Sequence, residues 1–166
     1  MKSYRSAREL LAEIEQLLAA NKPTFGCSPL DRVIEMLIKG RHYSWVGIYL
    51  TVGEKSQHLL GSSGDAPLNV TTMPQSRAKM LVSIKLASRE IGVIAAESDR
   101  EFPFGSEDRV LLDKLANVLA RFLAGPGKYL VREAREKAAA SNTSVPTRRP
   151  QPASRNHRTA AAVGEK

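Results

Sequence analysis

The segment Tyr43–Val52 constrains the fold more than any other, because it is apolar on both faces of an extended chain. Side chains alternate along a strand with a period of two, so Trp45 and Tyr49 fall on one face, and Val46 and Ile48 fall on the other. A strand with two apolar faces lies between two layers of structure. The chain therefore has to build a sheet that is covered on both sides.

Three further extended segments follow this strand. Residues 56–62 form a weaker strand, residues 80–87 alternate between apolar and polar side chains, and residues 91–96 are apolar throughout. Turn residues stand between the first and second strands and between the third and fourth. We therefore predict two antiparallel hairpins, joined by a loop over residues 63–77 that contains two prolines.

Amphipathic helices are predicted on both sides of the strands. Apolar residues recur at three- and four-residue spacing in segments 4–20, 28–40 and 106–124. Ser28 precedes Pro29 at the start of the second segment, and Ser106 stands where it can cap the third. We predict an α+β domain over residues 4–124, with an antiparallel sheet and with the N- and C-terminal helices packed on one of its faces.

Residues 125–166 differ from this domain in composition. They hold 9 of the 25 lysines and arginines but 3 of the 17 acidic residues, so they carry most of the net charge of +8. Residues 128–140 can form a polar helix, and the remainder consists mainly of Ser, Thr, Pro, Arg and Ala. Such a segment buries too little apolar surface to offset its ordering entropy, so we expect a disordered basic tail.

Charge and apolar content also limit the partners and the compartment. No apolar run approaches the roughly 18 residues that a membrane span needs, so we expect no span and a cytoplasmic protein. The single cysteine, Cys27, fits that compartment. His42 and His58 have no neighbours at metal-ligand spacing, and no metal site is predicted. We expect no nucleic-acid binding except through the tail, where Arg148, Arg149, Arg155 and Arg158 are the candidate contacts.

Three motifs near the end of the predicted domain resemble the GAF domain family, and they follow one another in that family's order. They are the strand Arg89–Ala96, the helix start at Ser106–Asp108 and the apolar helix turn Val110–Ala116. The resemblance covers about residues 5–124, and it implies a GAF-like fold and a role in signal transduction. It also implies that the terminal helices can pair in a homodimer. The sequence does not assign Leu10, Leu17, Leu115 and Phe122 to one helix face, and a homodimer would cover any of this apolar surface that the fold leaves exposed.

Within that family, the strand Ser44–Tyr49 is similar to the free methionine-R-sulfoxide reductases. In those enzymes the tryptophan and the tyrosine line the substrate pocket, so the resemblance makes Trp45 and Tyr49 candidate ligand-binding residues. Glu97 joins them, because it falls on one of the family's two pocket aspartates. A structural interpretation stays open, in which the aromatics pack as core under residues 63–77 and Glu97 is a solvated acid at a strand end.

The chain departs from the reductases at the groups that carry their chemistry. Their cysteines lie between the second and third strands, where residues 63–77 contain none, and Met80 and Ala95 stand where the family has acids. Attack on a sulfoxide needs a thiol and a proton donor, so we predict no catalytic residues. The leading prediction is a non-catalytic module that binds a small ligand or a protein partner. A divergent reductase that uses Cys27, and nucleic-acid binding through the tail, are the alternatives.

The short 63–77 segment also implies a reduced lid, because the corresponding region covers the pocket in ligand-binding GAF domains. A shallow or open site disfavours cyclic nucleotides, haem and bilins. No cofactor is therefore expected.

Overall fold

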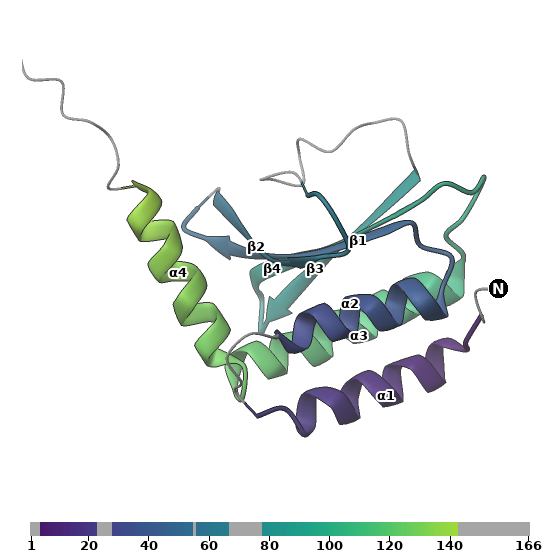
Figure 1. Cartoon of the computed structure of the whole chain (residues 1–166), viewed down its shortest axis with the longest axis horizontal. Coiled ribbons are helices and arrows are strands. Elements are labelled where there is room, and N and C mark those ends of the chain that lie inside the picture. Colours follow the sequence, from purple (N-terminus) through teal and green to yellow (C-terminus); the bar gives the residue numbers. More distant parts are fainter. Residues whose placement is uncertain (1–3, 23–27, 55, 67–77, 143–166) are drawn as a thin grey trace, which may run out of the picture.

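The computed structural model describes residues 4–22, 28–54, 56–66 and 78–142. Its centre is an antiparallel sheet with the strand order β2-β1-β4-β3 (Figure 1). The strands are β1 (Trp45–Val52), β2 (Ser56–Ser62), β3 (Ala78–Leu86) and β4 (Arg89–Ser98). The two predicted hairpins are β1–β2 and β3–β4, and the pairing of β1 with β4 joins them into one sheet. The two most apolar segments are therefore its central strands.

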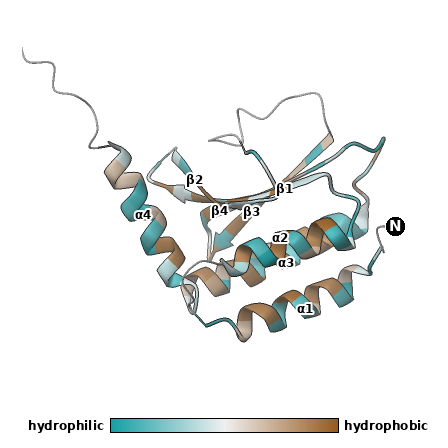
Figure 2. Ribbon diagram, in the orientation of Figure 1, coloured by the Kyte–Doolittle hydropathy of each residue, from teal (hydrophilic) through white to brown (hydrophobic). Residues whose placement is uncertain are grey.

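Helices cover one face of the sheet in two layers. Helices α2 (Pro29–Gly40) and α3 (Ser106–Ala124) pack on the strands, and α1 (Ala7–Ala19) packs on α2 and α3 from outside (Figure 1). Figure 2 shows hydrophobic and hydrophilic residues alternating around α1 and α2, as amphipathic helices require. The predicted α+β arrangement, with an antiparallel sheet and helices on one face, is confirmed.

The main core lies between these helices and the sheet. It is almost entirely aliphatic, and its strand residues include Val46, Ile48, Val82, Ile84 and Ile94. The four residues considered above for a homodimer take part in it: Leu10, Leu115 and Phe122 are buried, and Leu17 packs against the cluster while partly exposed. Their apolar surface is thus used within the chain, and a homodimer remains a prediction.

The start of α3 differs from the prediction. Ser106 is the first helical residue, and Gly105 occupies the cap position in its place. The Asp108 carboxylate, in the first turn, accepts the N–H of Gly105 at 3.1 Å. Asp108, the third helical residue, therefore binds the backbone N–H of the cap residue, as the acidic residue of a capping box does.

A fourth helix, α4 (Lys128–Asn142), follows the turn Gly125-Pro126-Gly127. It lies beside the β2 edge of the sheet (Figure 1) and contacts β1, β2 and α3. Leu130 and Val131 pack against the main core, and Ala134 is buried. This helix falls within the segment predicted as a tail, because three apolar residues at helical spacing reach the domain. The division of the chain at residue 124 stays a prediction, and residues 143–166 lie outside the described residues.

Two further expectations concern a membrane span and the lid. In the described ranges no helix is both long enough and apolar enough to cross a bilayer. The predicted lid segment falls mostly on residues 67–77, which lie outside the described residues.

Candidate functional site

The sheet face turned away from α2 and α3 carries the residues singled out from the sequence. Trp45 and Tyr49 form a cluster with Val93 and Ala95 that is separate from the main core. Residues directly opposite one another in a ladder project to the same face, and Trp45 lies opposite Glu97 while Tyr49 lies opposite Val93. The structure therefore brings all three candidate ligand-binding residues to one face of the two central strands.

Gly47 allows the Trp45 ring to lie along β1. A Cβ atom at position 47 would stand 2.4 and 2.8 Å from the Cη2 and Cζ2 atoms of the indole. The indole ring therefore occupies the space that a side chain at position 47 would fill, on the face that Trp45 shares with Tyr49. The signal for this arrangement is the spacing Trp-x-Gly-x-Tyr, which places the glycine on the face of the two aromatics.

All three candidate residues are buried. The exposed fractions are 8% for Trp45, 0% for Tyr49 and 7% for Glu97. For the aromatics this burial fits both a ligand wall and an ordinary core. For Glu97 it contradicts the interpretation as a solvated acid at a strand end. The reason is its position on a central strand, opposite Trp45 on one side and opposite Lys79 on the other.

Polar atoms of this face lie in apolar surroundings. Burial raises the pKa of the Tyr49 hydroxyl, and the negative charge of Glu97 adds to that effect. The indole nitrogen of Trp45 is buried and has no hydrogen-bond partner in the part of the chain that the structure describes. An unpaired buried donor costs about 1–3 kcal/mol, so an acceptor placed against Trp45 would be favoured.

Lys79 is a member of this face that the sequence analysis did not include. It lies directly opposite Glu97 and therefore projects to the same side. Met80, which aligns with a reductase glutamate, packs against the main core on the other face. A shift of one residue moves a strand side chain to the opposite face, so the alternation of residues 80–86 already placed position 79 on the face opposite Met80. The register of β3 with β4 then sets it beside Glu97. A basic and an acidic group therefore adjoin the aromatic pair.

The remaining chemistry-bearing residue of the sequence analysis is Cys27, which lies outside the described residues. It is the only cysteine of the chain. The described part of the site thus offers a carboxylate, an ammonium group, an indole N–H and a phenol. These groups bind polar molecules but include no thiol nucleophile.

Several solved structures have a similar fold. The X-ray structure of free methionine-R-sulfoxide reductase from Neisseria meningitidis in complex with its substrate aligns at 20% identity over 83% of this chain and 99% of that chain, with a TM-score of 0.59. A GAF domain from a Coxiella burnetii phosphoenolpyruvate-protein phosphotransferase aligns at 16% identity over 81% and 97%, with a TM-score of 0.60. The corresponding Acinetobacter GAF domain aligns at 14% identity over 82% and 97%, with a TM-score of 0.58.

Comparison at the level of sequence gave no such likeness. No protein-family model matches the chain, and no curated protein matches it. The evidence is therefore the shape of the domain, which extends over most of this chain and nearly all of each similar structure. On that evidence, the chain has the fold of the GAF domain.

Proposed function

We propose that this protein is a non-catalytic regulatory or sensory module of the GAF type, which binds a small ligand on the face formed by Trp45, Tyr49 and Glu97. The observation that carries the proposal is the buried indole nitrogen of Trp45, which has no hydrogen-bond partner among the described residues. Trp45 also lies directly opposite Glu97 in the pairing of β1 with β4. A similar fold holds the substrate of the Neisseria meningitidis free methionine-R-sulfoxide reductase. That likeness supports a small molecule as the ligand.

The chemistry of the face favours a ligand of amino-acid type. The Glu97 carboxylate can accept hydrogen bonds from an ammonium group, and the Lys79 ammonium group opposite it can donate to a carboxylate. The rings of Trp45 and Tyr49 offer an apolar wall for a side chain. The indole N–H would serve an acceptor such as a sulfoxide oxygen. Methionine and its sulfoxides combine these groups and are the first ligands to test.

The absence of catalysis rests on the cysteine content. Sulfoxide reduction needs a thiolate, and the chain has Cys27 alone, which lies outside the segment between β2 and β3. A single thiol also has no second cysteine in the chain with which to form a disulfide after attack. The divergent-reductase alternative would therefore require Cys27 to act with an external thiol.

Intrinsic fluorescence tests ligand binding directly, because Trp45 is the only tryptophan of the chain. We expect titration with methionine or either of its sulfoxides to shift the emission saturably and to raise the melting temperature. Glu97→Gln should weaken binding at least tenfold. Glu54→Gln, at the exposed β1–β2 turn, is the matched control and should leave it unchanged. An emission spectrum that stays constant at saturating concentrations of all three compounds would refute this ligand class.

A turnover assay tests the non-catalytic part of the proposal. Purified protein with thioredoxin, thioredoxin reductase and NADPH should not consume free methionine-R-sulfoxide. Turnover by the wild type that disappears in Cys27→Ser would overturn the proposal in favour of the reductase alternative. Binding without turnover would support a sensor that uses a pocket of reductase type.

A further inference from the structure

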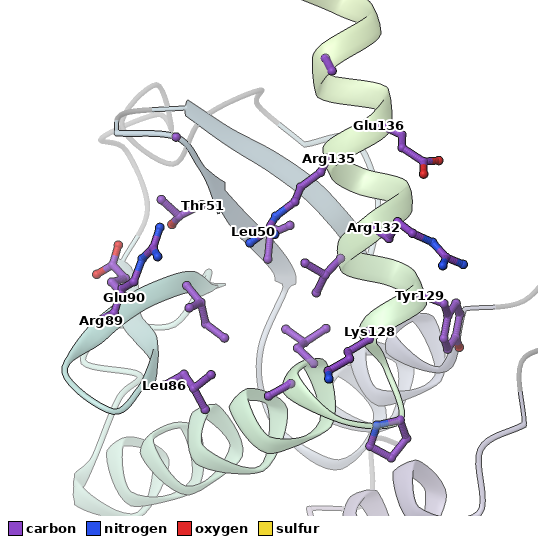
Figure 3. Close-up of a pocket in the computed structure, with 17 residues that line it drawn as sticks. Leu50, Thr51, Leu86, Arg89, Glu90, Lys128, Tyr129, Arg132, Arg135 and Glu136 are labelled. Carbon is purple, nitrogen blue, oxygen red and sulfur yellow. The ribbon is translucent and has the colours of Figure 1, made fainter.

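A groove lies between α4 and the end of the sheet, away from the Trp45 face (Figure 3). Its volume is about 920 Å³, within the range of roughly 300–1,000 Å³ that is usual for small-molecule sites. Its walls come from the β1 end at Leu50 and Thr51, from the β3–β4 turn, from the α3 end and from α4. None of the residues that cluster around Trp45, which are Tyr49, Val93 and Ala95, lines the groove, so the groove and the Trp45 face are separate sites.

The wall formed by α4 is held in position at its start. The Gly127 N–H donates to the Phe122 carbonyl at 2.8 Å, and a Cβ atom at position 127 would meet the Phe122 ring at 2.5 Å. The Asn21 side chain donates to the Tyr129 hydroxyl at 3.1 Å and so ties α4 to the end of α1. The groove is therefore bounded by anchored elements.

The floor of the groove is apolar. Leu86 and Ile91 line it from the β3–β4 hairpin, Leu123 from α3 and Val131 from α4. Leu86 is 44% exposed, which is a high fraction for a leucine in a hairpin of the sheet. The floor thus presents aliphatic surface that the described part of the chain leaves open to a molecule in the groove.

The charges that point into the groove are positive. In Figure 3 the Arg135 side chain runs from α4 toward the sheet, Arg89 extends from the β3–β4 turn toward Thr51, and Lys128 reaches in from the start of α4. None of these three cations forms an ion pair with another described residue. The hydroxyl oxygen of Thr51 is buried and likewise lacks a partner within the described ranges.

Neither acidic residue of the lining, Glu90 or Glu136, forms an ion pair with these cations. Glu90 accepts a hydrogen bond from the Ser83 hydroxyl at 2.6 Å. Glu136 points away from the groove, as does Arg132 on the same side of α4 (Figure 3). An apolar floor under cations that form no ion pair with other described residues is complementary to a molecule with an apolar body and one anionic group.

We propose that this groove binds a small amphipathic anion, a free molecule with an aliphatic body and a carboxylate. The aliphatic part packs against Leu86, Ile91 and Val131. The carboxylate lies between Arg89 and Arg135, because the planar guanidinium group donates two parallel hydrogen bonds to a carboxylate. The groove, walled by two helices and the sheet, suits a single molecule rather than a membrane surface.

Decanoate below its micelle concentration is the probe, and isothermal titration calorimetry with the full chain is the measurement. We expect one saturable site, with no change of the Trp45 emission because that residue does not line the groove. The double variant Arg89→Gln, Arg135→Gln should weaken binding at least tenfold. Arg132→Gln, on the same helix but turned outward, is the matched control and should change the affinity less than twofold. Leu86→Ser should weaken binding without removing a charge.

Other results would overturn the proposal. If decyltrimethylammonium binds as tightly as decanoate, the cations do not select the ligand. If Arg132→Gln weakens decanoate binding as much as the double variant does, the binding site is not this groove. Anionic phospholipid vesicles that bind through Arg89 and Arg135, without any decanoate binding, would assign these cations to a membrane surface. Calorimetry measures decanoate binding in the groove, and Trp45 fluorescence measures ligand binding at the Trp45 face. The two proposals can therefore be refuted independently.

Discussion

The Arg41 side chain donates two hydrogen bonds to one oxygen of Asp108, from Nε at 3.1 Å and from Nη2 at 2.6 Å. The Tyr43 hydroxyl donates to the same oxygen at 2.8 Å, while the other oxygen accepts the Gly105 N–H. Arg41 and Asp108 are both buried. This ionic cluster joins the end of α2 to the start of α3, beneath the end of the sheet at which β1 begins.

Replacing Asp108 by asparagine should destabilise the domain strongly. The change removes the buried counter-charge of the Arg41 guanidinium and leaves it only the half-exposed carboxylate of Glu107, at 3.4 Å. Breaking a buried pair in this way costs about 3–5 kcal/mol. Urea denaturation at pH 7 measures the effect. The control is Asp113→Asn, whose exposed pair with Arg109 at 3.4 Å should contribute less than about 1 kcal/mol. Equal free energies of unfolding in the two variants would contradict this role of Asp108.

The same carboxylate, Asp108, should make the free energy of unfolding depend on pH in the acid range. Burial alone would raise the pKa of Asp108, but hydrogen bonds from Arg41, Tyr43 and the Gly105 amide hold it below its usual value. A depressed pKa contributes stability that is present above the unfolded-state value of about 3.9 and is lost as pH falls through the folded-state value. Between these two pH values, the free energy of unfolding should therefore fall by up to roughly 1.4 kcal/mol more per pH unit of acidification in the wild type than in Asp108→Asn.

Replacing Gly47 by alanine should displace the Trp45 ring. The new Cβ atom would overlap the indole, and overpacking of this kind costs about 1–3 kcal/mol. A displaced indole is expected to show red-shifted fluorescence, and thermal denaturation gives the loss of stability. Gly64→Ala is the control, because a Cβ atom there meets nothing within 4 Å and its effect should stay within about 0.5 kcal/mol. An unchanged emission spectrum in Gly47→Ala would show that the ring does not occupy this place.

Replacing Gly127 by alanine should loosen α4. The added Cβ atom would meet the ring of Phe122, which is buried in the main core and cannot easily give way. Hydrogen exchange measured by mass spectrometry should become faster over residues 128–142, and the affinity for decanoate should fall with the loss of the groove wall. Slow exchange over α4 at the wild-type rate would refute this role of the glycine. Gly64→Ala again serves as the unstrained comparison.

Much of the fold could be predicted from the sequence, because local periods and turn residues agree with one another. Apolar residues change from helical spacing before Gly40 to the period of two of a strand after Tyr43, and this change separates helix α2 from strand β1. The turn at Ser88 indicated the second hairpin. The start of α3 could not be predicted, because Ser106 and Gly105 are both acceptable caps by composition. Asp108 decides between them through a hydrogen bond and a buried partner, Arg41, that lies 67 positions away.

The candidate site was predicted only in part. Trp45, Tyr49 and Glu97 follow from strand alternation and the family resemblance, but the burial of Glu97 depends on the pairing of β4 with both β1 and β3. Strand order is a property of the assembled sheet, so single-segment patterns do not contain it. The groove depends on where α4 packs, and Lys128 and Arg135 looked like the charges of a solvated tail.

The turn Gly125-Pro126-Gly127 also decides how motion can pass along the chain. A helix that continued straight on from α3 would act as a stiff rod and would carry a rotation of one end to the other through its hydrogen-bond ladder. Here the ladder is interrupted, since Pro126 has no N–H to donate and α4 sets off in a new direction (Figure 1). A rotation of α3 about its axis is therefore not passed to α4 through a continuous helix. A movement of α4 would instead follow from its side-chain contacts with β1, β2 and α3.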